Sequence, residues 1–321
     1  MRHTLIARLG PLTPLVLLLA CDAVPSDVPP APNPSIAAQL SSAGWSEWSE
    51  PVNLGAPVNS AFTEQNSALS KDGLTLYIQS NRPGGLGGND LWVSHRASLD
   101  SPWEEPVHLG NVVNTAGAEG GPWLSNDEHL LFFHSDRPGG MGDRDIWVSQ
   151  RRDEHDDFGW EAPVNLGPLV NTAEAELSPA IVEVGSGGHT LYFQRGPQGL
   201  SGVDIYQVTI TQDGVPLAPA NLVVELSVPG ANDASPNPSK DGREIIFAST
   251  RSGGGGGLFV STRRSVNDPW KPPVSLGGSL SANANGPKVS RDGRTMMFFS
   301  TRAGGVGGFD IWMTTRTRAE N

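Results

Sequence analysis

The chain has 321 residues, of which 37% are hydrophobic and 17% are charged, and its formal net charge is -12. This composition is typical of a folded globular chain, and the acidic balance argues against a nucleic-acid partner, because a polyanion would be repelled. The 39 glycines and 27 prolines recur at corresponding positions, so they predict turns between many short strands rather than disorder.

Residues 1–20 have the pattern of a bacterial signal peptide. Arg2 and Arg8 precede an apolar run over residues 12–20, which is too short to span a bilayer as a helix. The end of this run, Leu18-Leu19-Ala20-Cys21, resembles the lipobox of bacterial lipoproteins. This resemblance implies lipidation of Cys21 and attachment to the membrane through a lipid anchor only. The alternative is an ordinary secretory signal with an incidental cysteine.

Residues 21–44 are predicted to form a tether. The segment is polar and rich in proline, and it has no hydrophobic period. Because proline-rich segments stay extended, we expect it to hold the following domain away from the membrane.

Residues 45–317 consist of five copies of one repeat, which is the main guide to the architecture. The first copy combines Trp48, the turn Ser70-Lys71-Asp72-Gly73, the loop Ser80-Asn81-Arg82-Pro83-Gly84-Gly85 and the ending Asp90-Leu91-Trp92-Val93. The second and fifth copies are similar to the first in sequence, whereas the third and fourth match it less well. The recurrence predicts one domain built from five similar units.

Each copy contains four predicted strands, which in the first copy cover residues 65–69, 75–79, 90–95 and 103–109. Such a unit is typical of a blade, so we predict an all-β fold, a five-bladed β-propeller of four-stranded antiparallel blades. The repeat begins in its fourth strand and stops after the third strand of the last copy. The N-terminal strand is therefore expected to complete the last blade and close the ring.

The motifs of the first copy resemble the WD40-like repeat of TolB-type propellers, above all the loop Ser80-Asn81-Arg82-Pro83-Gly84-Gly85 and the ending Asp90-Leu91-Trp92-Val93. The resemblance covers residues 45–317. It implies a location in the bacterial cell envelope, on the periplasmic side or at the cell surface, and a role in binding or scaffolding rather than in catalysis. Fold alone does not determine function.

The glycine loops are predicted to be structural. A phosphate-cradling loop would be followed by a helix, and here a strand follows. We expect each aspartate to accept backbone amides and each arginine to reach that aspartate or a neighbouring carbonyl. The predicted clasps pair Arg82 with Asp90, Arg137 with Asp145, and Arg302 with Asp310.

An acidic residue precedes the inner strand in four of the five copies, at Glu64, Glu119, Glu176 and Asp233. If these carboxylates converge near one mouth of the channel, they would bind a divalent cation or a basic group of a ligand. Alternatively, each carboxylate caps backbone amides within its own blade. Both interpretations are compatible with the regular spacing.

No catalytic motif, metal site or cofactor is predicted from the sequence, and His155 lies in a charge run that we expect to be solvated. The favoured function is a monomeric, non-enzymatic module that binds an envelope protein or a cell-wall component. A purely structural role is a further alternative. The enzymatic alternative is a five-bladed glycoside hydrolase that uses axial carboxylates.

Overall fold

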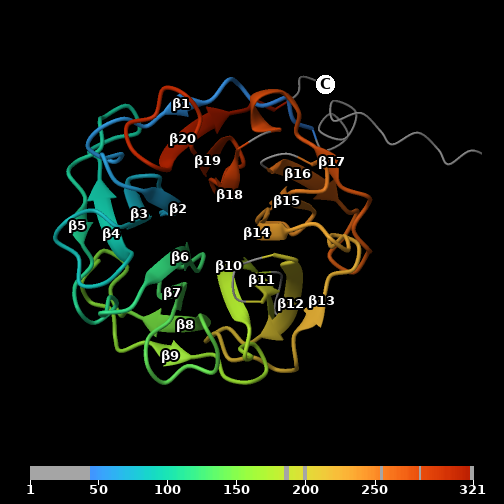
Figure 1. The fold of residues 1–321 in the computed structure, drawn as a ribbon, viewed down its shortest axis with the longest axis horizontal. Coiled ribbons are helices and arrows are strands. Elements are labelled where there is room, and N and C mark those ends of the chain that lie inside the picture. The colour runs from blue at the N-terminus through green and yellow to red at the C-terminus, as the bar shows by residue number, and fades with distance from the viewer. Residues whose placement is uncertain (1–43, 184–187, 198–200, 254–255, 282, 319–321) are drawn as a thin grey trace, which may run out of the picture. The chain divides into compact units, whose positions relative to one another are not determined.

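A computed structural model describes residues 44–183, 188–197, 201–253, 256–281 and 283–318. The predicted signal peptide, Cys21 and all but the last residue of the tether lie outside the described residues. Within the described part, the strands form five separate four-stranded antiparallel sheets. These sheets are arranged as blades around a central channel (Figure 1). The predicted five-bladed β-propeller is confirmed.

Each blade runs outward from an inner strand at the channel. In this order the first two blades are β2 (Glu64–Leu69), β3 (Thr75–Ser80), β4 (Asp90–His95) and β5 (Val107–His108), then β6 (Glu119–Leu124), β7 (Leu130–Ser135), β8 (Asp145–Gln150) and β9 (Val164–Asn165). The third and fourth are β10 (Ala175–Glu183), β11 (His189–Gly196), β12 (Asp204–Ile210) and β13 (Asn221–Leu222), then β14 (Asp233–Pro238), β15 (Glu244–Ser249), β16 (Gly257–Thr262) and β17 (Val274–Ser275). The fifth is β18 (Asn285–Val289), β19 (Thr295–Ser300), β20 (Asp310–Thr315) and β1 (Val52–Asn53).

The ring is closed by strands from opposite ends of the repeat region, as predicted. β1 pairs antiparallel with β20, with Val52 opposite Met313. A further bridge joins Trp45 to Arg318. This pairing covers the edge that β20 would otherwise expose.

The outer strands are shorter than predicted, since each contains only two residues. The sequence suggested a strand over residues 103–109, whereas the structure forms β5 only at Val107 and His108. Pro106 directly precedes β5, and proline cannot donate a hydrogen bond to the sheet. Prolines at the same position, Pro51, Pro163 and Pro273, precede the outer strands β1, β9 and β17.

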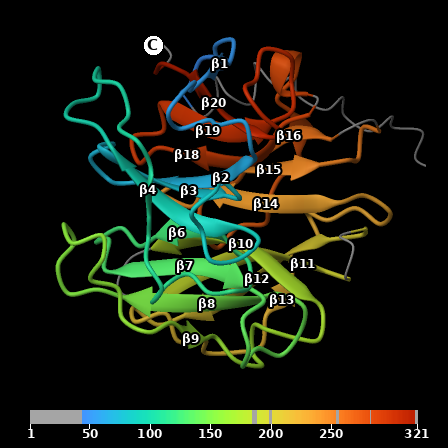
Figure 2. The same ribbon diagram turned by 60° about the vertical axis from the view of Figure 1, so that its left-hand side comes forward.

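The core lies between neighbouring blades, whose sheets follow one another as layers (Figure 2). One apolar cluster joins Tyr77 and Leu91 of the first blade to Leu131 and Phe133 of the second. All four side chains are fully buried, and each apolar side chain of this size stabilises the fold by roughly 1.5–3 kcal/mol. The large side chains of the repeat therefore hold the blades together rather than line the channel.

All five inner strands contain a β-bulge. At each bulge one residue has a positive φ, and three of these residues are not glycine: Asn66, Ser178 and Ser235. The other two are Gly121 and Gly286. The bulges bend the inner strands where they approach the channel.

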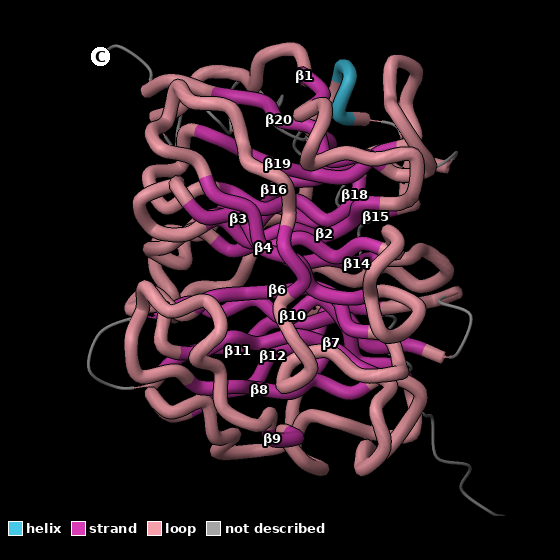
Figure 3. Tube along the Cα trace, turned by 90° about the vertical axis from the view of Figure 1, so that its left-hand side faces the viewer, coloured by secondary structure: helices cyan, strands magenta, loops and turns pink. Residues whose placement is uncertain are grey.

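The described residues are almost entirely strands and loops, with one helical turn, η1 (Gly278–Leu280) (Figure 3). None of the helical structure in this part of the chain has the length and apolar character that crossing a membrane requires.

Candidate functional site

The four carboxylates predicted to form an axial ring are the first or second residues of β2, β6, β10 and β14. Glu64, Glu119, Glu176 and Asp233 are completely buried, with 0% exposure. None of them is among the residues that line either cavity of the channel. Their surroundings explain this position.

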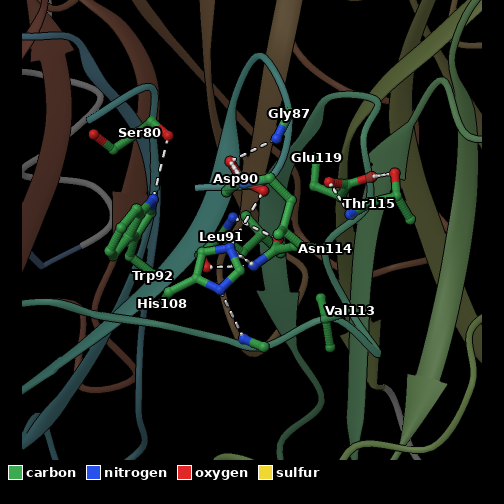
Figure 4. A network of polar contacts seen from close by, with 12 residues as sticks. Ser80, Gly87, Asp90, Leu91, Trp92, His108, Val113, Asn114, Thr115 and Glu119 are labelled. Carbon is green, nitrogen blue, oxygen red and sulfur yellow. Dashed lines mark hydrogen bonds and ion pairs between the residues drawn. The ribbon is translucent and has the colours of Figure 1, made fainter. Parts of the chain in front are cut away.

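Glu119 shows how such a carboxylate is held within its own blade (Figure 4). It accepts hydrogen bonds from the backbone amide of Thr115 at 2.9 Å, the Thr115 hydroxyl at 2.7 Å and the Ser135 hydroxyl at 2.7 Å. The guanidinium of Arg137 lies 3.2 Å away. The carboxylate is therefore fully occupied by groups of the second blade.

The same arrangement recurs in three other blades. The ion pairs are Arg82 with Glu64 at 3.2 Å, Arg195 with Glu176 at 2.8 Å and Arg251 with Asp233 at 2.7 Å. In the fifth blade Ala284 takes the place of the acid, and Arg302 donates to the carbonyl of Ser279 instead.

Of the two contacts predicted for Arg82, the one to a neighbouring carbonyl is confirmed at Val58, whereas the pairing with Asp90 needs correction because the guanidinium binds Glu64. Asp90 instead accepts the amide of Gly87 at 3.3 Å and lies 3.4 Å from His108 (Figure 4). The arginines reach inward to the start of the inner strand, while each aspartate, the first residue of the third strand, holds the glycine loop before it.

The other two predicted clasps differ in the same way. Asp145 accepts the amide of Gly142 at 3.2 Å and the side-chain amide of Asn165 at 2.9 Å, whereas Arg137 binds Glu119. Asp310 accepts the amide of Gly307 at 3.2 Å. Arg302 bonds to Ser300 and Ser279.

The cation site proposed for the acidic ring stays a prediction. Among the described residues, no group of three or more histidine, cysteine, aspartate or glutamate side chains has the arrangement needed to hold a metal ion. His155, which was expected to be solvated, is exposed and lies 3.7 Å from Glu154.

One mouth of the channel lies where the inner strands begin, and we call it the amide mouth. This cavity of about 420 Å³ is lined by polar side chains such as Gln65, Gln79 and Gln194. Gln79 accepts the backbone amide of Gly121 at 3.2 Å, so it ties the first blade to the bulge of the second. Among the described residues that line it there is no aspartate or glutamate.

His134 continues this pattern of contacts between blades in the amide mouth. It is buried, and burial lowers its pKa to about 3, with Arg144 and Lys288 contributing in the same direction. The ring is therefore neutral near pH 7, and Nδ1 accepts the backbone amide of Ser178 at 3.4 Å. This histidine joins the second blade to the third.

The other mouth lies where the inner strands end, and we call it the basic mouth. Its cavity has a volume of about 750 Å³, which is in the usual range for a small-molecule site. Among the described residues that line it, ten are basic and five are acidic, although the whole chain is acidic. The basic ones are Lys71, Lys240, Arg243, Arg263, Arg264, Lys271, Lys288, Arg291, Arg316 and Arg318, and the acidic ones are Glu128, Glu183, Asp241, Glu244 and Asp292.

Lys288 of β18, in the lining of the basic mouth, is only 6% exposed. Its Nζ has no hydrogen-bond partner among the described residues and lies 4.5 Å from the centre of the half-buried Trp123 ring. Burial lowers the pKa of Lys288 to about 7. Near pH 7 the buried amine is therefore partly protonated, and it forms no ion pair with a described acidic side chain.

Asn237 of β14 lies beside this lysine. Its Oδ1 accepts the backbone amide of Val289 at 2.9 Å, and this bond connects the fourth blade to the fifth. Its Nδ2 is buried and has no acceptor in the described part of the chain. Three blades thus bring two unpaired donors and an indole together, through Lys288, Asn237 and Trp123.

Glu128 is a second unusual residue of the basic mouth. It has a φ of 62° at the turn position that Gly73, Gly242 and Gly293 occupy in other blades. A left-handed backbone is unfavourable for a glutamate, and such strain is concentrated at functional sites. The side chain is buried, and burial raises the pKa of its carboxyl.

Glu183, at the end of β10, provides another carboxylate in a different environment. It is half-buried and accepts the backbone amide of Asn126 at 2.5 Å. Glu128 likewise accepts the amide of Lys71, so each carboxylate is fixed by the turn of the preceding blade. The two carboxyl groups are held alike but differ in burial, since Glu128 is buried and Glu183 is half-buried.

Sequence reasoning did not identify Lys288, Glu128 or Glu183 as site residues. A signal was present for Lys288, because the equivalent positions in the other copies hold Ala68, Trp123, Ala180 and Asn237. A lysine at an inner-strand position departs from the repeat, and a departure of this kind can be read from the sequence.

No protein-family model matches the sequence, and no curated protein matches it significantly. The fold is similar to an α-L-arabinofuranosidase from Podospora anserina, with a TM-score of 0.53, 10% identity, and coverage of 85% of this chain and 96% of that one. It is also similar to an endo-arabinase from Bacteroides thetaiotaomicron, with a TM-score of 0.56, 16% identity, and coverage of 82% and 96%. A putative TolB from Agrobacterium tumefaciens has a TM-score of 0.48, 16% identity, and coverage of 81% and 79%.

These neighbours correct the prediction that the protein is not an enzyme, because enzymes such as the arabinofuranosidase and the endo-arabinase are among the structures that share this fold. At 10–16% identity the likeness establishes the fold, so an activity has to come from this chain's own side chains. The TolB likeness is too low to support the finer WD40-like assignment.

Proposed function

We propose that the protein is a glycoside-cleaving propeller whose catalytic carboxyl groups lie in the basic mouth. The observation that carries this proposal is Glu128, a buried carboxyl with a raised pKa, held at a strained backbone position beside a cavity of about 750 Å³. Three other blades place glycine in that slot, so the turn itself does not require a glutamate.

Glycoside hydrolysis generally uses two carboxyl groups with different protonation states. Glu128 fits the general acid, since burial favours its protonated form and allows it to donate a proton to the leaving glycosidic oxygen. Glu183 fits the second role, because its half-buried carboxylate is fixed by the Asn126 amide and can deprotonate an attacking water.

The remaining carboxylates support this choice. Glu64, Glu119, Glu176 and Asp233, the axial set considered from the sequence, are all held in buried ion pairs. The amide mouth has no carboxyl group among its described lining residues. The arabinofuranosidase and endo-arabinase neighbours support the same class of reaction on a similar fold.

Glu128→Gln is expected to lower the rate of glycoside cleavage by about 10²-fold or more, because the amide cannot donate the proton that the leaving oxygen needs. The assay measures new reducing ends from arabinan, arabinoxylan and polygalacturonate with the purified full chain. Glu105→Gln, which changes an exposed carboxylate outside both cavities, serves as the matched control. Absence of reducing ends from all three polymers, or equal rates for Glu128→Gln and the wild type, would contradict the proposal.

We also propose that the protein is anchored in the cell envelope by lipidation of Cys21, as its lipobox-like context suggests. Cys21→Ser is expected to abolish incorporation of a tagged fatty acid and to move the protein from the membrane fraction to the soluble fraction, because the thiol is the acylation site. The measurement is in-gel detection of the tag after expression in a bacterial host. Equal labelling of the variant and the wild type would disprove this anchor.

A further inference from the structure

The base of the basic mouth contains a cation that the described chain does not neutralise. Only 6% of the surface of Lys288 is exposed to solvent, and its Nζ has no hydrogen-bond acceptor among the described residues. A buried charge of this kind is unfavourable unless something pairs with it. Because the Lys288 side chain belongs to the lining of an open cavity, an anionic group of a ligand can supply that partner.

A second unpaired donor lies next to it. Asn237 Nδ2 is buried without an acceptor, while Asn237 Oδ1 is fixed by the amide of Val289, the residue after Lys288. One ammonium and one amide N–H group at neighbouring positions match the two oxygens of a carboxylate. A neutral hydroxyl would satisfy only part of this pair and would leave the charge of Lys288 uncompensated.

The third component of this site is an aromatic surface. Trp123 is half-buried, lines the same cavity, and its ring centre lies 4.5 Å from Lys288 Nζ. An indole face next to a charged group suits a ligand that carries apolar C–H groups and an anion on one ring. Sugar acids have this combination.

The rim of the basic mouth favours the same ligand. Basic side chains outnumber acidic ones by ten to five there, in a protein whose formal net charge is -12. Clustered positive charge in a concave site raises the local concentration of anions and speeds their association. The charge of the mouth therefore opposes that of the rest of the chain.

We propose that Lys288, Asn237 and Trp123 form a subsite for a uronic-acid residue of an acidic oligosaccharide. Lys288 Nζ and Asn237 Nδ2 bind the carboxylate, and Trp123 supports the sugar ring. This assignment rests on the proposed function for the saccharide class, and it adds the charge of the substrate. A cell-wall polysaccharide rich in uronic acid would be such a partner.

The test measures binding rather than turnover, and it uses the full-length Glu128→Gln variant so that the ligand stays intact. Isothermal titration compares trigalacturonate with its fully methyl-esterified form, which has the same sugars without the charge. We expect the acid to bind about 30-fold more tightly or better, because loss of one partner of a buried charge pair weakens binding by at least that factor. Equal affinities, or no binding of either ligand, would overturn the subsite.

Two substitutions test the named residues in the same background. Lys288→Met is expected to remove the preference for the acid over the ester, whereas Lys240→Met, at an exposed lysine of the same cavity, should change it less than about threefold. Asn237→Asp keeps the acceptor for Val289 and gives Lys288 a permanent counter-charge, so it should weaken acid binding by about tenfold or more.

Each further result counts for or against the subsite. The subsite would be contradicted if Lys288→Met kept the preference for the acid over the ester. It would also be contradicted if Lys240→Met lost this preference to the same extent as Lys288→Met. Trigalacturonate that binds but is not cleaved by the wild type would support the subsite and contradict the hydrolase. Cleavage of polymers without any preference for the acid in binding would support the hydrolase and contradict the subsite. Inorganic sulfate that matches the affinity of trigalacturonate would show a site for any anion and overturn the assignment to a sugar acid.

Discussion

Replacing Glu119 by alanine is expected to lower the free energy of unfolding by about 3–5 kcal/mol, because it leaves the charge of Arg137 buried without a partner. Glu119 also accepts bonds from the amide and hydroxyl of Thr115 and from the Ser135 hydroxyl, and all of these donors lose their acceptor. Urea unfolding followed by tryptophan fluorescence measures the change.

Two further variants separate the buried pair from surface charge. Glu161→Ala should leave the unfolding midpoint unchanged, because Glu161 is 58% exposed and lies 3.8 Å from an almost fully exposed Arg152. The double variant with Glu119→Leu and Arg137→Met should recover most of the stability that Glu119→Ala loses, since it removes both charges together. If Glu119→Ala were as stable as Glu161→Ala, the pairs described here would not hold the blades.

In contrast to Glu119→Ala, Lys288→Met is expected to stabilise the protein and to raise the free energy of unfolding by about 2–4 kcal/mol near pH 6. Methionine has a similar length and removes a cation that is buried without a hydrogen-bond partner in the described chain. Loss of the contact between Lys288 and the Trp123 ring offsets the gain by roughly 0.5–2 kcal/mol.

The pH dependence of this gain follows from the pKa of Lys288, which burial lowers from 10.5 to about 7. Below pH 7 the amine is charged in both the folded and the unfolded states, so the destabilisation is fully present. Between pH 7 and 10.5 the unfolded state binds a proton that the folded state lacks, so the wild type gains stability from this group as pH rises. The difference between Lys288→Met and the wild type should therefore shrink over that range.

Thermal unfolding of the two proteins at pH 6 and pH 10 checks this result. Lys240→Met, at an exposed lysine of the same cavity, is the control and should show no comparable gain at either pH. A Lys288→Met protein less stable than the wild type at pH 6 would mean that the lysine is part of the structural framework. A gain in stability combined with loss of acid binding is the pattern expected of a residue retained for function.

The fold was predictable because its signals are local and repeated. The short apolar run Leu91-Trp92-Val93 indicates a buried strand, and the glycine loop before it indicates a turn. Five copies of that pattern leave few architectures other than a propeller. The length of the outer strands was overestimated, because Pro106 cannot donate a hydrogen bond to the sheet and this effect was not taken into account.

The acidic position at the start of the inner strands could be located from the sequence, but its partner could not. Arg82 is closer in sequence to Asp90 than to Glu64, and yet it pairs with Glu64. The choice depends on β3 running back alongside β2, which places residue 80 opposite residue 64. Which residues lie opposite each other in a hairpin cannot be read from their spacing in the sequence until the register of the two strands is known.

The basic mouth could not be assembled from the sequence, because its residues come from different blades. Lys288, Trp123 and Asn237 are far apart along the chain and meet only when β18, β6 and β14 surround one channel. Glu128 departs visibly from the Asp-Gly turn of three other copies, but burial of its carboxyl depends on the neighbouring first blade, whose Lys71 amide it accepts.

The pairing of β1 with β20 has a consequence for how the protein is made. Val52 is synthesised before all the other strands of the propeller and Met313 after β2 to β19, so β1 must wait for those strands before it finds its partner. Contacts between such distant residues form late, since they require closure of a very long loop. A nascent chain carrying four finished blades would still present an open ring, and the basic mouth would take its final shape only after β20 has left the ribosome.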